Sequence, residues 1–320
     1  MPDRRATINA LAWIVLTTPA AVAQDLPRLL YGQEKGSGCE IAVWDAAKDE
    51  SMLLADVDTC PEQLFVSADG ETAFFVDRDT LIVAPTRAGS KSTSLPMPAL
   101  DYHRWAADAE TRMHPKNLEM IAEHVMKPAA AGFFDNGDPA IQLQMFGPAD
   151  DSLVYLLAYD GQAWSLKDGR SCGRWEFPCT FDPSRYRSSD VWTWPESRMV
   201  WHPDIASNPY YAGAESVAVD LEFESYQAAD QKRFFHVDGK RSEISFFTRP
   251  SEHSDTLHTF GVTLSVDGGN PRELSGNQCL TSVAGRYILV NEFFLSRFEV
   301  TDIGTGQTVI ANLKAAMWLN

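Results

Sequence analysis

The sequence predicts an all-β protein, specifically a β-propeller of about six blades, with five to seven possible. Short runs rich in β-branched and aromatic residues follow one another along most of the chain, separated by Gly, Asp and Asn turns. The stretch 260–310 is a string of such hairpins. Stretches that begin near Cys60 and Cys279 share one order of strands and turns. A unit of four short strands, repeated about every 40–50 residues, is typical of a propeller blade.

The first 23 residues have the features of a secretory signal peptide. Arg4 and Arg5 precede the apolar run 11–16, which is too short to span a bilayer, and an Ala-Val-Ala cleavage box ends at Ala23. We expect cleavage there, which leaves 24–320 as a single propeller domain. No later stretch of about 18 apolar residues follows, so the sequence predicts a periplasmic or secreted protein without membrane insertion.

The net charge argues against a nucleic-acid ligand. The 320 residues carry a formal charge of -17, and removal of residues 1–23 takes away two Arg and one Asp, which changes this to -18. Binding to phosphates requires clustered Lys and Arg, which this composition disfavours. The acidic residues are spread along the chain, an arrangement that favours solubility.

Strands are expected wherever a short apolar or β-branched run lies between turn residues. Asp-Gly pairs between such runs, as at Asp69-Gly70 and Asp238-Gly239, are the strongest hairpin signals. The expected strands cover 28–32, 39–45, 51–55, 61–68, 72–76, 80–84, 140–146, 153–158, 162–166, 190–194, 198–201, 215–222, 233–237, 242–248, 260–266, 272–274, 280–283, 286–290, 297–302 and 307–310.

The segment 100–134 interrupts this pattern. Pro115 suits the first turn of a helix, apolar residues follow at helical spacing from Leu118 to Val125, and Pro128 would stop the helix. The sequence therefore predicts one short helical insertion near 115–127, which either caps a pocket or covers a sheet edge.

The apolar run 315–319 lies close to the end of the sequence. The first repeat is short of one strand, so we expect this run to pair beside it and close the ring of blades. The alternative is a frayed tail.

Export permits disulfides, and five cysteines remain after cleavage. Cys172 and Cys179 flank a short loop and are the first expected pair, with Cys39 and Cys60 the second. This leaves Cys279 unpaired, although spacing alone does not determine connectivity.

Two segments resemble a known repeat. The run 267–274, Asp-Gly-Gly-Asn-Pro-Arg-Glu-Leu, follows the strand GVTLSV and is similar to the repeat of TolB-like (WD40-like) propellers, and so is 67–75. The resemblance covers about two blades well and implies the propeller fold. The heavy chains of periplasmic amine dehydrogenases are more distantly similar.

Motifs for the common catalytic chemistries are not in the required context. No G-x-S-x-G pattern is placed at a strand-to-helix elbow, and the H-E-x-x-H and C-x-x-C-H patterns are absent. Asp77 and Asp79 begin an EF-hand-like pattern that stops after two acids, so a hairpin turn explains them. No cofactor is predicted.

His253 and His258, together with Glu252 and Asp255, form the densest cluster of metal-ligand types. Imidazole and carboxylate ligands suit Zn or Cu. The alternative, which we favour, is a polar hairpin loop.

Aromatic residues gather between 192 and 211. Trp192 and Trp194 alternate on one face of their expected strand, which favours packing over binding. The Pro-rich loop after them is the preferred binding candidate, because exposed aromatic rings can hold a sugar or a peptide. Its candidate residues are Trp201, His202, Tyr210 and Tyr211.

The functional hypothesis from the sequence is an exported scaffold, non-enzymatic, that binds a periplasmic protein or a small ligand through its loops. The alternative is an enzyme or an enzyme subunit, such as an accessory chain of a periplasmic dehydrogenase or a lyase that acts on sugars. Catalytic residues in propellers come from several blades, so the lack of a motif is weak evidence against it.

Overall fold

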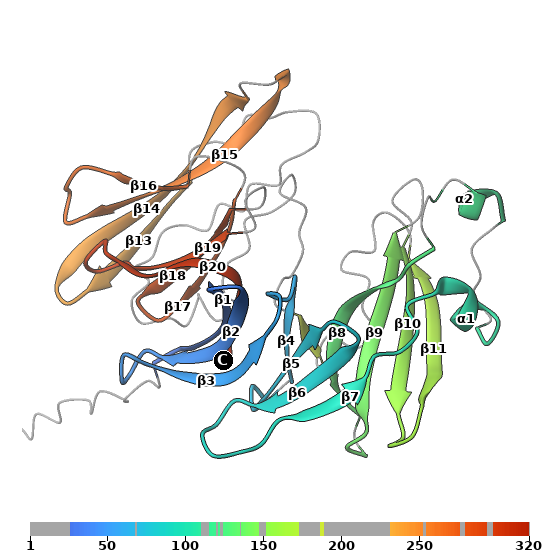
Figure 1. The fold of residues 1–320 in the computed structure, drawn as a ribbon. Helices are drawn as coiled ribbons and strands as arrows, with labels where there is room; N and C mark the ends of the chain where they lie inside the picture. The colour runs from blue at the N-terminus through green and yellow to red at the C-terminus, as the bar shows by residue number, and fades with distance from the viewer. Residues whose placement is uncertain are drawn as a thin grey trace, which may run out of the picture.

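The computed structural model describes residues 26–319, with the exception of 68, 110–114, 120, 122–123, 135, 147–151, 173–185, 189–230, 252–253, 276–278 and 293–296. These residues form antiparallel sheets with two short helices, α1 (Tyr102–Ala106) and α2 (Pro115–Glu119) (Figure 1). The all-β class is confirmed. The expected strands 190–194, 198–201 and 215–222 and the signal peptide lie outside the described residues.

The strands belong to four hydrogen-bonded sheets. The first has seven strands in the order β17 (Cys279–Ala284), β18 (Tyr287–Glu292), β19 (Arg297–Asp302), β20 (Thr308–Trp318), β1 (Arg28–Lys35), β2 (Gly38–Asp45) and β3 (Glu50–Val57). The second has β12 (Tyr186–Ser188), β4 (Leu64–Ser67), β5 (Thr72–Asp77), β6 (Thr80–Pro85) and β7 (Thr93–Pro96). The third has β11 (Trp164–Cys172), β10 (Ser152–Tyr159), β9 (Pro139–Phe146) and β8 (Lys127–Phe133). The fourth has β13 (Gln231–Val237), β14 (Lys240–Ser251), β15 (Ser254–Val266) and β16 (Arg272–Ser275).

The sheets stack face to face, with an apolar core between neighbours (Figure 1). Strands β13–β15 pack against β17 and β18, which in turn face β1 and β2. Strands β1 and β2 also pack against β4 and β5, which face β9 and β10 through a further core. The seven-stranded sheet and the sheet of β4–β7 therefore bury both faces, unlike a two-layer sandwich with one solvated side.

Strand β5 shows how one strand contributes to two cores. Side chains of a strand point alternately to opposite faces. Phe74 enters the core shared with β9 and β10, whereas Ala73 and Phe75 enter the core shared with β1 and β2. All three are fully buried. The unbroken apolar run Ala-Phe-Phe-Val is explained by this burial on both faces.

Strand β20 joins the two parts of the seven-stranded sheet. Its first half pairs with β19, where Val300 lies opposite Ile310, and its second half pairs with β1, where Leu30 lies opposite Met317. The backbone changes direction between these halves at Asn312, which has a φ of 61°. The expected strand at 315–319 is confirmed, although it continues the strand expected at 307–310 rather than standing alone.

The bend at β20 brings the two parts of this sheet against each other. Trp44 of β2 meets Tyr287 of β18 edge to face, with ring centroids 5.0 Å apart. Leu29, Val300 and Trp318 are buried in the same core.

The turn between β4 and β5 lies against the residue that follows β20, Leu319. Gly70 has a φ of 72°, and a Cβ at this position would overlap the carbonyl oxygen of Leu319. The Ser67 hydroxyl donates to Asp69 Oδ1 at 2.6 Å, and this bond is the main cause that lowers the pKa of Asp69. The Thr86 hydroxyl donates to the Gly70 carbonyl at 2.8 Å. The turn is therefore fixed from both sides by side-chain hydrogen bonds.

The helix expected near 115–127 is wrong in its length. Helix α2 ends at Glu119, and Val125 is instead paired with Asp101 in an antiparallel bridge. The Met126 amide donates to the Leu100 carbonyl at 2.7 Å, just before β8 begins. These bonds hold the end of the segment extended, which overrides its helical spacing.

The structure joins Cys39 and Cys60 in a disulfide, which is the second pair expected from the sequence. Cys39 lies in β2, and Cys60 packs against the core between β1–β2 and β4–β5. Only the backbone of Cys172 and Cys279 is described, and Cys179 lies outside the described residues. The Cys172–Cys179 pair therefore stays a prediction.

Replacing Cys39 and Cys60 together by Ser is expected to lower the free energy of unfolding by about 3 kcal/mol. The disulfide closes a loop with a sequence separation of 21, and its removal restores the entropy of the unfolded chain. Urea unfolding at equilibrium without reductant measures the loss. Cys279→Ser serves as the control, because Cys279 is not part of this disulfide. Equal stability of the double variant and the parent would contradict the prediction.

Candidate functional site

The binding and metal residues expected from the sequence are not brought together by the described part of the chain. Trp201, His202, Tyr210, Tyr211 and His253 lie outside it, and they stay predictions. The backbone of His258 lies in β15, opposite Pro250 of β14, and its side chain is not described.

A G-x-S-x-G sequence does occur, at 169–173, but in a different structural context from that of a hydrolase. Gly169, Arg170 and Ser171 lie within β11, where Ser171 pairs with Leu153 of β10. The nucleophile of an α/β hydrolase instead lies on a sharp turn from a strand into a helix. The motif therefore lacks the context that would make Ser171 a nucleophile.

The connection 97–126 between β7 and β8 is the part of the described chain that departs most from hairpins. It carries α1, which packs on β9 and β10, and α2 (Figure 1). Asp101 caps α1, because its Oδ1 accepts from the His103 amide at 2.9 Å. The indole of Trp105 donates to the Ala99 carbonyl at 2.6 Å. We call this connection the insertion.

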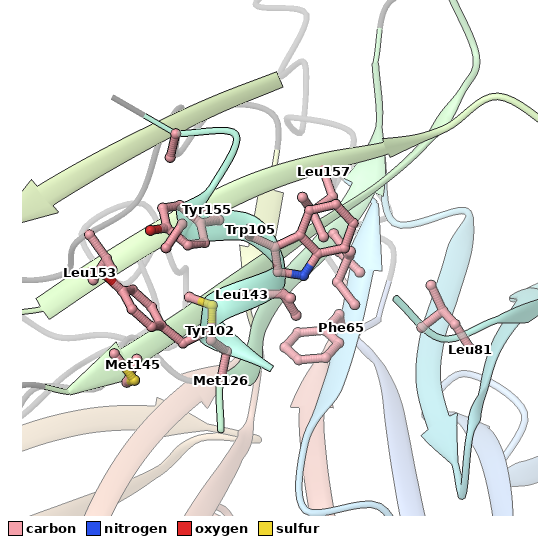
Figure 2. Close-up of a cluster of buried hydrophobic side chains, with 14 of the residues drawn as sticks. Phe65, Leu81, Tyr102, Trp105, Met126, Leu143, Met145, Leu153, Tyr155 and Leu157 are labelled. Atoms are coloured by element: carbon pink, nitrogen blue, oxygen red, sulfur yellow. The ribbon is translucent and has the colours of Figure 1, made fainter. Parts of the chain in front are cut away.

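Buried aromatic side chains fix the insertion to the core. Tyr102 and Trp105 of α1 point into the cluster formed by β9 and β10, as Figure 2 shows. The rings of Tyr102 and Tyr155 are stacked, with centroids 6.3 Å apart and planes at 15°. Met126, at the other end of the insertion, is fully buried in the same cluster. Burial of side chains of this size stabilises the packed position by about 1.5–3 kcal/mol each.

Two histidines meet on the outer side of the insertion. His103 Nε2 lies 3.1 Å from His124 Nδ1, and the ring planes are at 89°. His124 Nε2 lies 3.0 Å from the carbonyl oxygen of Leu118. A carbonyl oxygen only accepts, so His124 carries its hydrogen on Nε2 and, when neutral, leaves the Nδ1 lone pair directed at His103.

The surroundings of the histidine pair are charged and open to solvent. His103 is exposed and His124 is half-buried. Arg104 is paired with Asp108 at 2.6 Å and lies over the ring of Trp105, 4.6 Å from its centroid. The charge of Arg104, which adjoins His103 in sequence, is therefore paired with a carboxylate. Imidazoles in this arrangement can bind a transition metal. No group of three or more metal-ligand side chains occurs among the residues that the structure describes.

A second charged cluster joins two sheets and has a structural role. Arg286 contacts Asp238 at 2.7 Å and Asp302 at 2.8 Å, which links the β13–β14 turn to the end of β19. Burial disfavours the charge of this guanidinium, but the two carboxylates outweigh it and raise the pKa of Arg286. The Ser242 hydroxyl donates to the Ile303 carbonyl at 2.6 Å beside this cluster. The cluster therefore links the two sheets, with the side chains of Arg286 and Asp302 mostly buried and that of Asp238 68% exposed.

The histidine pair is not predicted by the sequence. His124 does not fit the H-E-x-x-H zinc pattern, and no motif distinguishes His103. The signal that could have indicated the pair is weak. His103 is the second residue of the short helix α1, and His124 lies just before strand β8. Their meeting depends on the bond from the Tyr102 amide to the His124 carbonyl, 2.9 Å, which no sequence period encodes.

Comparisons with known proteins place the chain in no family. No family model matches it, and neither does any curated protein. Solved structures align over 92% of the chain: a candidate 6-phosphogluconolactonase from Bacteroides uniformis (12% identity, 100% of its chain, TM-score 0.32), a nidogen/laminin complex (10%, 98%, 0.29) and apo AztD from Citrobacter koseri (11%, 99%, 0.28). TM-scores of this size define neither the fold nor the function of this chain.

Neither described helix has the length or apolar character that crossing a membrane requires.

Proposed function

We propose that this protein is an exported, non-enzymatic binding scaffold in which a stack of β-sheets holds loops in place for a partner protein or a small ligand. The observation that supports it best is the insertion. Its inner side is fixed by Tyr102, Trp105 and Met126 in the core, and its outer side presents exposed polar and apolar groups. A loop held by a rigid scaffold is the usual position for binding residues.

The stack of sheets supports a propeller as its architecture. Neighbouring sheets pack on one another in a row from β13–β16 to β8–β11, as adjacent blades of a propeller do. The resemblance of 67–75 and 267–274 to TolB-like repeats supports the same proposal. In this proposal 24–320 form one ring of about six blades, in which β20 connects the last blade to the first.

Export is supported by the signal-like residues 1–23 and by the Cys39–Cys60 disulfide. Structural disulfides persist in oxidising compartments such as the periplasm. The proposed location is therefore the periplasm or the exterior of the cell.

Affinity capture with the mature chain tests whether the insertion binds a partner. Val125 of the insertion is 49% exposed, and its replacement by Asp is expected to reduce capture of the periplasmic partner at least tenfold. Leu53 of β3 is 52% exposed, so Leu53→Asp is a matched control that should leave capture unchanged. Equal capture by all three proteins would exclude the insertion as the binding surface. Turnover of a substrate by the purified chain would overturn the non-enzymatic assignment.

The aromatic loop around Tyr210 is a second proposed binding surface. Trp201 and His202 lie close to it in sequence. Its test is separate, because Tyr210→Ala/Tyr211→Ala should weaken binding of glycans or peptides by the mature protein. Unchanged binding would remove this surface from the proposal.

A further inference from the structure

We propose that His103 and His124 form a binding site for a divalent transition-metal ion, with Zn²⁺ as the representative ion. The site would bind through His103 Nε2 and His124 Nδ1, which face each other at 3.1 Å. This inference does not depend on the proposed binding scaffold, because it rests on the geometry of the two imidazoles alone.

The distance between the two nitrogens suits a shared metal ion. Zinc–imidazole bonds are about 2.0–2.1 Å, and tetrahedral angles then place two ligating nitrogens about 3.3 Å apart. The observed separation of 3.1 Å requires only a small opening of the pair. Imidazole nitrogen is a preferred ligand of Zn, Cu and Ni rather than of Mg or Ca, which defines the class of ion.

The second nitrogen of His124 is held as it is in many metal sites. A ligating histidine usually donates its other N–H to a carbonyl or carboxylate, which fixes the tautomer and the ring orientation. His124 Nε2 has this partner in the Leu118 carbonyl at 3.0 Å. The Nδ1 lone pair consequently faces His103, and a metal ion would take the place of the hydrogen between the two rings, with neutral His103 then carrying its hydrogen on Nδ1.

The backbone under the pair is already in place before an ion binds. The Tyr102 amide donates to the His124 carbonyl at 2.9 Å, and Asp101 and Val125 form the neighbouring bridge. The His103 amide is bound by the cap residue Asp101. Ordering of these two segments therefore does not oppose binding, which favours affinity.

The charges around the site tolerate a cation. Arg104, the nearest basic side chain in sequence, is neutralised by Asp108. The protein as a whole carries a formal charge of -17, which attracts cations to its surface. With two protein ligands, the remaining positions are open to water or to a group from another molecule. The site would therefore hold an exchangeable ion rather than a structural one.

The test uses the mature protein, freed of metal by EDTA and dialysed against Zn²⁺. We expect the parent to bind one Zn²⁺ more than His103→Gln and one more than His124→Gln. Long-range ¹H–¹⁵N spectra of the histidine side chains should show Zn²⁺ shifting Nε2 of one ring and Nδ1 of the other. Glutamine at 124 retains an amide that can donate to the Leu118 carbonyl, and circular dichroism verifies that each variant is folded.

His236→Gln is the matched control, because His236 is an exposed imidazole in β13. It should bind as many Zn²⁺ ions as the parent. Equal stoichiometry in all four proteins would overturn the proposal and leave a simple hydrogen bond between the two rings. Loss of one ion in His236→Gln as well would also overturn it, because the binding would then be non-specific. The proposal would equally be wrong if the parent protein bound no Zn²⁺.

Discussion

Replacing Gly70 by Ala is expected to lower the free energy of unfolding by about 3 kcal/mol or more. Gly70 has a φ of 72°, which L-residues with a side chain adopt at a cost. The added Cβ would also overlap the backbone oxygen of Leu319, which has no side-chain rotation to relieve it. Either the β4–β5 turn or the end of β20 must move. Chemical denaturation of the purified mature variant measures the loss.

Gly89→Ala separates these two causes. Gly89 has a similar φ of 85°, and nothing lies within 4 Å of a Cβ built on it. This control should therefore lose only the conformational part, about 1–2 kcal/mol. If the Gly70 and Gly89 variants lose the same free energy of unfolding, the overlap with the Leu319 oxygen adds nothing to the cost, and the prediction is wrong.

A chain that ends at Asn312 is expected not to fold cooperatively. The missing residues form the half of β20 that pairs with β1. They also remove buried side chains from two cores, among them Leu313 and Trp318 from one and Met317 from the other. Loss of each large side chain costs about 2–5 kcal/mol, so the three together cost about as much as the usual total stability of about 5–15 kcal/mol. Circular dichroism and limited proteolysis would report the unfolded state.

Lys314→Ala is the control for the truncation. It tests whether a single substitution in the part of β20 that pairs with β1 is enough to abolish cooperative folding. Its side chain is 39% exposed and pairs with Glu34 at 3.2 Å. Exposed ion pairs contribute up to about 1 kcal/mol, so this variant should unfold close to the parent. A truncated chain that keeps a sharp unfolding transition would show that the β1–β20 pairing is dispensable.

The strands were largely predictable because their signals are local. Asp238-Gly239 and Asp267-Gly268 are tight turns in which both residues have positive φ values, as Asp-Gly between apolar runs predicts. The run from Ala73 to Val76 is apolar because both faces of β5 are buried. Neither feature requires knowledge of distant parts of the chain.

The insertion was less predictable because its shape depends on contacts between its two ends. The spacing of Leu118 and Ile121 is helical, and both side chains do pack against the core. The helix nevertheless stops at Glu119, and Val125 is extended because it pairs with Asp101. A local pattern therefore predicted the buried side of this segment and not its backbone.

The histidine pair was not predictable for the same reason. His103 and His124 are 21 residues apart. Their rings are brought together by the β-bridge between Asp101 and Val125, which no pattern in the sequence predicts. The sequence pointed instead to His253 and His258, which are neighbours along the chain. Metal-ligand residues that are close together in sequence therefore do not reveal a site that two distant segments form.

The position of β20 has a consequence for the order of folding. Strand β20 lies between β19 and β1, which are far apart in sequence, and Leu29 of β1 is opposite Trp318 of β20. The seven-stranded sheet therefore cannot be completed until β20 has been synthesised. Contacts this distant in sequence form slowly, because a very long loop must close first. Late completion of this sheet would suit the export proposed above, because the closing strand pairs only after the whole of β20 is present.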